Sequence, residues 1–140
     1  MRYTYIIVGI LIKLVFTGCE NHDEQISTFS LNDTTELLMH ETIFNYESQI
    51  SISMDSVLSD SRCPMDVICF WAGNAEVRFT FSHKKQDTVF NLNTHGGSHF
   101  RSDSSINGFN IRLLELFPYP ETTNDIHQTD YYAKIIVDLE

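Results

Sequence analysis

Residues 75–82 read Ala-Glu-Val-Arg-Phe-Thr-Phe-Ser, a strict alternation of apolar and polar side chains. Successive side chains of a β-strand point to opposite faces, so this period of two predicts a strand with one buried and one solvated face. Ile50, Ile52 and Met54 alternate with polar residues in the same way, and so do residues 132–139. The hydrophobic pattern therefore predicts a protein built from β-strands.

Shorter segments extend this pattern along the chain. Four of them are predicted to be strands: residues 28–31, 36–39, 89–92 and 109–115. In the last segment, Phe109, Ile111, Leu113 and Glu115 form the alternating set. Six or seven strands separated by turn residues predict an all-β fold, a small antiparallel sandwich or barrel.

Two segments are open to a different interpretation. Residues 111–117, Ile-Arg-Leu-Leu-Glu-Leu-Phe, have a composition that also permits a helix, which Pro118 and Pro120 would limit. Residues 93–107 are polar and contain two adjacent glycines. We expect this second segment to be a long, mobile loop.

The first eighteen residues differ from the rest of the chain. Arg2 precedes a mostly apolar run from Ile6 to Phe16, and small residues close it. This order is typical of a secretory signal peptide. A membrane-spanning helix is the competing interpretation, but such a helix needs about 20 apolar residues, and Lys13 interrupts this shorter run. We therefore expect residues 1–18 to be a cleaved signal peptide.

Cys19 follows directly, in the sequence Phe16-Thr17-Gly18-Cys19. These residues resemble the lipobox of bacterial lipoproteins, with Phe16 where Leu or Val is usual. The resemblance implies that the Cys19 sulfur receives a diacylglycerol and that Cys19 becomes the first mature residue. Two fatty acyl chains, such as palmitate, give stable membrane anchoring. We expect a lipid-anchored protein of the bacterial cell envelope, at the outer membrane and facing either the periplasm or the outside.

Behind this anchor, residues 19–27 are predicted to form an acidic tether and residues 28–140 a single β domain. The whole sequence has nine basic and nineteen acidic residues, a formal net charge of −10. Residues 1–18 contain two of the basic residues and none of the acidic ones, so the mature part carries −12. Nucleic acids and anionic head groups bind basic patches. We therefore expect no nucleic-acid partner, and contact with the membrane only through the N-terminal lipid.

Setting Cys19 aside leaves Cys63 and Cys69, separated by a short loop in which Pro64 bends the chain. Thiols pair in oxidising compartments, so a structural disulfide is the preferred interpretation for an exported protein. A zinc site would need two more ligands at a matching spacing, and no second Cys pair exists. A redox-active pair is disfavoured because the C-x-x-C spacing is absent.

The segment around this pair resembles a known signature. It comprises Asp60-Ser61-Arg62-Cys63-Pro64 and Cys69-Phe70-Trp71-Ala72-Gly73-Asn74-Ala75. It is similar to a D-S-R-C-P…C-x-W-x-G-x-A motif in a family of small exported bacterial proteins, many of them assigned as lipoproteins. That family has no established activity. The resemblance therefore implies a compartment and a domain, but no chemistry.

We interpret the motif as a structural scaffold. Trp71 is expected to pack against the sulfurs and seal the loop onto the sheet. Gly73 is expected to adopt a positive φ, and Arg62 to pair with Asp60 or Asp66. The alternative is that this stapled loop is a recognition surface.

His95 and His99 are weak candidates for a metal site. They share one loop, but Gly96-Gly97 argues against the helix that would align an i,i+4 pair, and no third ligand follows at a telling spacing. The sequence also lacks the G-x-S-x-G pattern of a serine hydrolase and a phosphate-binding loop. We expect neither a cofactor nor an enzymatic activity.

Three functional hypotheses follow from these features. The leading one is a lipid-anchored envelope protein whose β domain is non-catalytic and binds a protein or small ligand. The second is an inhibitor-like module that inserts the Cys63–Cys69 loop into a protease cleft. The third is a metal-binding protein that uses His95 and His99.

Overall fold

The computed structural model describes residues 26–97 and 99–140 of the chain. The predicted signal peptide, Cys19 and residues 19–25 of the predicted tether lie outside the described residues. The predicted all-β fold is confirmed, with nine strands and no α-helix in the described ranges. These ranges contain no helical segment that is long and apolar enough to cross a membrane.

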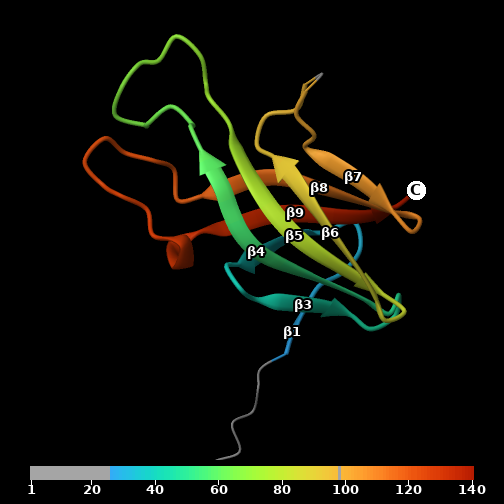
Figure 1. Ribbon diagram of the computed structural model, residues 1–140. Helices are drawn as coiled ribbons and strands as arrows, with labels where there is room; N and C mark the ends of the chain where they lie inside the picture. The colour runs from blue at the N-terminus through green and yellow to red at the C-terminus, as the bar shows by residue number, and fades with distance from the viewer. Residues whose placement is uncertain (1–25, 98) are drawn as a thin grey trace, which may run out of the picture.

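The strands form two separate sheets (Figure 1). The five-stranded sheet has the order β1 (Ser27–Thr28), β3 (Thr42–Asn45), β4 (Ile50–Asp60), β5 (Ala75–His83), β6 (Gln86–Asn93). The four-stranded sheet has the order β2 (Thr34–Leu38), β9 (Tyr132–Leu139), β8 (Phe109–Phe117), β7 (Asp103–Ile106). A 3₁₀ turn, η1 (Gln128–Asp130), precedes β9.

This topology corrects three expectations. The barrel is wrong, because the two sheets are not closed on one another. The predicted number of strands is too low, since β3 was not predicted and β7 forms inside the segment predicted to be a loop. The first sheet is also mixed rather than antiparallel, because β1 pairs in parallel with β3.

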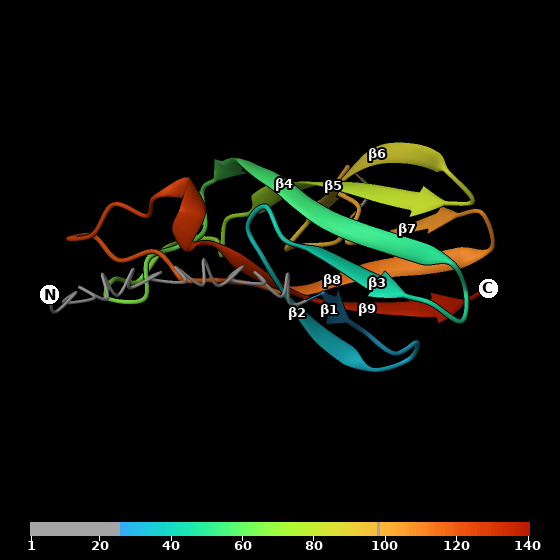
Figure 2. The same cartoon turned by 90° about the horizontal axis from the view of Figure 1, so that it is seen from below.

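The core lies between the two sheets, which Figure 2 shows as two layers. Val77, Phe79 and Phe81 on β5 are buried, as their alternation predicts. They face apolar side chains of the second sheet, and the Phe81 and Phe109 ring centroids lie 5.7 Å apart. Burial of these inward faces is the main source of stability for such a two-layered fold.

Residues 111–117, for which a helix was the alternative, are part of β8. The register of β8 against β9 shifts between Leu113 and Glu115, so a β-bulge lies there. Leu113 and Leu116 are therefore both buried, although they are three positions apart. Glu115 is not on the inward face, and the alternation predicted through that residue is wrong.

Two long connections lie together at one end of the molecule (Figure 1). Residues 61–74 join β4 to β5, and residues 118–131 join β8 to β9. The short turns from β3 to β4 and from β5 to β6 lie at the other end of the five-stranded sheet. The motif residues 60–75 thus form one tip of the domain.

Candidate binding site at the disulfide loop

A buried ion pair forms the base of the β4–β5 connection. Arg62 Nε donates to Asp60 Oδ1 at 2.8 Å, and Arg62 Nη2 donates to Asp60 Oδ2 at 2.6 Å. The Arg62 backbone N–H also donates to Oδ1, at 3.1 Å. The Arg62 side chain is buried, and the Asp60 side chain is 10% exposed. The structure therefore selects Asp60, and not Asp66, as the partner of Arg62, in the paired geometry that a planar guanidinium favours.

Arg62 also ties this connection to the second sheet. Its guanidinium donates to the backbone carbonyl of Leu116, and Nη2 donates to the carbonyl of Pro118 at 2.8 Å. The guanidinium carbon lies 4.6 Å from the centre of the Tyr119 ring. One buried cation thus joins the end of β4 to the end of β8. Its guanidinium contacts carboxylate and carbonyl oxygens, which accept hydrogen bonds, and the face of one aromatic ring.

The surroundings of Asp60 set its ionisation. Burial raises the pKa of Asp60, but the hydrogen bonds and the charge of Arg62 outweigh this effect, so the pKa lies below its ordinary value of 3.8. Tyr131 donates its hydroxyl to Asp60 Oδ2 at 3.1 Å. Burial, together with the negative charge of Asp60, raises the pKa of Tyr131 to about 12. Asp60 therefore stays ionised and Tyr131 stays a donor near neutral pH.

The predicted disulfide between Cys63 and Cys69 is confirmed, with Cα atoms 5.9 Å apart. The Cys63 N–H donates to the Ala72 carbonyl at 2.8 Å and extends the β4–β5 pairing toward the loop. Closing a loop of about seven residues stabilises the fold by roughly 2 kcal/mol in the chain-entropy description. The disulfide and this hydrogen bond together restrict the conformations of the loop.

The connection from β8 to β9, residues 118–131, is hydrogen-bonded to the disulfide loop. The Met65 N–H donates to the Pro120 carbonyl at 2.9 Å, and the Thr122 N–H donates to Asp66 Oδ1 at 3.0 Å. The Thr122 hydroxyl donates to the other carboxylate oxygen of Asp66. These hydrogen bonds from Thr122 hold the pKa of Asp66 below its ordinary value. The two connections are thus held together at the tip of the domain.

Gly73 closes the loop where the chain returns to β5. Its φ of +73° confirms the predicted left-handed conformation. A Cβ atom at this position would stand 1.9 Å from the carbonyl oxygen of Ser61. Only glycine allows the two backbones to approach this closely.

Five apolar side chains on this loop face the solvent: Met65, Val67, Ile68, Phe70 and Trp71, here called the apolar crown. Phe70 is 97% exposed and Trp71 is 73% exposed. Their rings contact each other edge to face, with centroids 5.7 Å apart. The expectation that Trp71 seals the loop onto the sheet is therefore wrong, because its side chain projects outward.

Ile68, Phe70 and Trp71 are the three most exposed side chains of the crown. The sequence interpretation considered only Trp71 among them. A signal for the others was present, since Val67, Ile68, Phe70 and Trp71 form an apolar run that belongs to no alternating strand. Apolar side chains that have no strand face to bury them are candidates for exposure. Contiguous exposed apolar patches mark interaction sites in soluble proteins.

The two weak metal candidates, His95 and His99, are both on the surface. His95 is exposed, and its backbone N–H donates to Asn74 Oδ1 at 3.2 Å; His99 is exposed as well. Within residues 26–97 and 99–140, no group of three or more His, Cys, Asp or Glu side chains is placed to hold a metal ion. His95 does line a small hollow of about 180 Å³ beside Cys63, Ala72 and Tyr119.

Comparisons with protein-family models, with curated proteins and with solved structures found no match. The geometry of the described residues is therefore the basis for a functional proposal. Its most unusual feature is an apolar surface displayed on a loop that is restrained from several sides.

Proposed function

We propose that this chain is a lipid-anchored protein of the bacterial cell envelope whose β domain is a non-catalytic binding module. In this proposal the apolar crown is the contact surface, and its partner is a protein. The signal-peptide pattern and Cys19 support the location. The exposure of the crown on a restrained loop is the observation that supports the activity.

The energetics of the crown favour a protein partner. Burying one large apolar side chain is worth about 1.5–3 kcal/mol, and residues such as Trp and Tyr dominate binding energies at interfaces. Such a gain is largest when the contact surface is already ordered, because less conformational entropy is then lost on binding. The disulfide, the Asp60–Arg62 pair and the Asp66–Thr122 contacts provide that order.

A lipid surface would also accept apolar side chains, but electrostatics favour a protein. The mature part carries a net charge of −12 when the nine basic and nineteen acidic residues are counted without Arg2 and Lys13. This charge opposes close approach to anionic head groups. Asp66, the charged side chain within the loop, adds to that repulsion.

The proposal is tested by crosslinking in intact cells followed by recovery of the protein. A Phe70→Ser/Trp71→Ser variant removes the two aromatic side chains of the crown without touching the core. Val89→Ser is the matched control, because Val89 is an exposed apolar residue on β6, away from the loop. A partner protein that crosslinks to the wild type and to Val89→Ser, but at least tenfold less to the double variant, is the expected result.

Two results would contradict the proposal. One is equal crosslinking of the double variant and the wild type. The other is flotation of the non-lipidated Cys19→Ala protein with phospholipid vesicles, lost in the double variant, which would identify a membrane as the partner of the crown.

A second candidate function is that of an inhibitor-like module. The specific observation in its favour is that the stapled loop presents Met65 with most of its side chain exposed, while its backbone N–H is held by Pro120. An inhibitor loop needs this combination of an exposed side chain and a fixed backbone. Inhibition assays on a panel of proteases test it, and Met65→Asp should weaken inhibition at least tenfold.

A further inference from the structure

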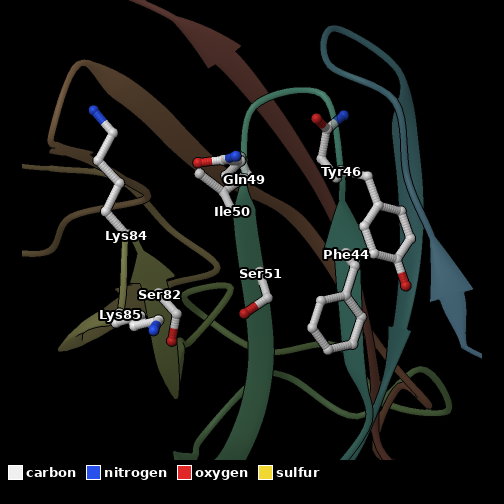
Figure 3. Close-up of a pocket in the computed structure, with 9 residues that line it drawn as sticks. Phe44, Tyr46, Gln49, Ile50, Ser51, Ser82, Lys84 and Lys85 are labelled. Carbon is white, nitrogen blue, oxygen red and sulfur yellow. The ribbon is translucent and has the colours of Figure 1, made fainter.

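A groove lies on the outer face of the five-stranded sheet, at the opposite end of β4 from the apolar crown. Figure 3 shows it between the end of β3 and the turn that joins β5 to β6. It has a volume of about 350 Å³, within the range of small-ligand sites. Its main lining side chains are Phe44, Tyr46, Gln49, Ser51, Lys84 and Lys85.

Two aromatic rings form one wall of this groove. Ile43 and Asn45 are buried, so the alternation of β3 turns Phe44 outward, and Tyr46 follows directly after the strand. The two rings are almost parallel, with an angle of 13° between their planes and centroids 6.0 Å apart. Tyr46 is 63% exposed. This aromatic pair does not contribute to the core, and it presents a flat apolar surface to the groove.

The turn that forms the opposite wall has an unfavourable backbone. Lys84 and Lys85 have φ values of 50° and 67°, and they are the two residues between the paired His83 and Gln86. Such a two-residue turn favours Asn-Gly, because a side chain at positive φ costs about 1–2 kcal/mol. Gln49, also in the groove, has a φ of 55°. Three of the six non-glycine residues with positive φ in the described ranges thus line this one groove.

The same turn carries two adjacent positive charges, those of Lys84 and Lys85. The chain has only nine basic residues against nineteen acidic ones, yet two of the nine are adjacent here. The ion pairs found among the described residues involve Arg62, Arg112 and Lys134, and neither Lys84 nor Lys85. The nearest acid on the hairpin, Asp87, accepts a hydrogen bond from the Ser82 hydroxyl. Both ammonium groups therefore remain available for an anionic ligand.

We propose that this groove binds an acidic saccharide. The apolar face of a sugar ring packs on Phe44 and Tyr46, as such C–H-rich faces do on aromatic rings. Lys84 and Lys85 hold the carboxylate or phosphate of the sugar, and Gln49 and Ser51 bond its hydroxyls. This site is separate from the apolar crown, since Ser51 and Asp60 stand at opposite ends of β4, roughly 30 Å apart at the rise of a strand.

The test is calorimetric titration of the purified protein with three probes. They are a trimer of galacturonic acid, a phosphorylated glucose, and neutral maltotriose. We expect binding of at least one acidic probe, at least tenfold tighter than maltotriose and weaker as salt is raised. Vesicles that carry a glucuronic-acid glycolipid form a further arm, which shows whether the sugar is recognised free or as a lipid head group.

The decisive variant is Lys84→Asn/Lys85→Gly. It removes both charges and introduces the residues that the turn prefers, so it should fold at least as well as the wild type while binding at least tenfold less. Tyr46→Ala should weaken binding by a similar factor. Arg78→Gln, which removes an exposed charge elsewhere on β5, should bind as the wild type does. Absence of binding to every acidic probe and to the glycolipid, or unchanged binding by the double variant, overturns the proposal.

Discussion

Arg62 organises the tip of the domain because its guanidinium joins the end of β4 to the end of β8. It pairs with Asp60, donates to the carbonyls of Leu116 in β8 and Pro118 just after it, and covers the Tyr119 ring. A buried charge of this kind is tolerated only when its donors are satisfied. These contacts hold the D-S-R-C-P segment against the second sheet, while the apolar crown stays exposed and is the surface that we propose contacts a partner.

Gly73→Ala tests the close approach of the two backbones at the loop base. The left-handed φ and the overlap with the Ser61 carbonyl oxygen should together cost roughly 3 kcal/mol in the free energy of unfolding. Gly97→Ala is the control, because a Cβ there meets nothing within 4 Å. We expect it to change stability by less than about 0.5 kcal/mol. Equal effects of the two substitutions in urea unfolding would contradict this account.

Asp60 should give the protein a specific acid sensitivity. Its pKa is lower in the folded protein than in the unfolded chain, so its stabilising contribution is present above about pH 4. That contribution is lost as the pH falls through the lowered pKa. Asp60→Asn should therefore cost roughly 3 kcal/mol at pH 7, because it leaves Arg62 buried without its counter-charge.

The same substitution should flatten the loss of stability between pH 5 and pH 2, measured by urea unfolding at each pH. Asp33→Asn, a change in the exposed turn before β2, should leave the wild-type slope unchanged. An Asp60→Asn protein that loses stability with acid as steeply as the wild type would show that this carboxylate is not the source.

At the scale of strands, β-bulges determine which apolar residues reach the core. In β4 the register shifts after Met54 and again after Val57, and in β8 it shifts after Leu113. Each extra residue reverses the alternation, so the next inward residue comes three positions on instead of two. This spacing also occurs on a helix face, so the pattern of residues 111–117 does not by itself exclude the helix that their composition permitted.

Leu116→Ala and Leu114→Ala test the bulge within one strand. Leu116 is 1% exposed, so its truncation should cost about 2–5 kcal/mol in unfolding free energy. Leu114 is 38% exposed at the bulge, so Leu114→Ala should lower the unfolding free energy by less than about 1 kcal/mol. Regular alternation would instead give two small and similar costs, since it places Leu114 and Leu116 on the same outward face. Thermal or urea unfolding of the two variants distinguishes these outcomes.

For the whole molecule, β4 separates two proposed contact surfaces. The apolar crown lies beyond its end at Asp60, and the groove lies beside its beginning at Ile50. Under the two proposals, the domain contacts a protein at one end and an acidic saccharide at the other. Lipid attachment would concentrate both surfaces at the membrane of the envelope.

The proposed lipid anchor is tested at Cys19. The wild-type protein should partition with membranes, and its mature N-terminal peptide should carry the mass of the lipid in mass spectrometry. Cys19→Ala should move the protein to the soluble fraction. Cys63→Ser/Cys69→Ser should stay with membranes while losing about 2 kcal/mol of stability. A mature N-terminus at another residue, without fatty acids, would contradict the anchor.

The sequence by itself determined the class of fold and the disulfide. Alternation along 75–82 and 132–139 records which face of each strand is buried, and this is a local property of the chain. The pairing of Cys63 with Cys69 is equally local, since six positions separate them. Both could therefore be predicted without knowledge of distant contacts.

Only the tertiary structure decided how the strands are divided between two open sheets and which loop residues stay exposed. Arg62 finds its carbonyl partners 54 and 56 positions away, and the groove joins a turn near Gln49 to a turn at Lys84. Such contacts depend on the free energy of packing the whole chain, which no short pattern contains. The apolar run near Phe70 is exposed because the connection from β4 to β5 carries it beyond the end of the five-stranded sheet, away from the core between the layers (Figure 1).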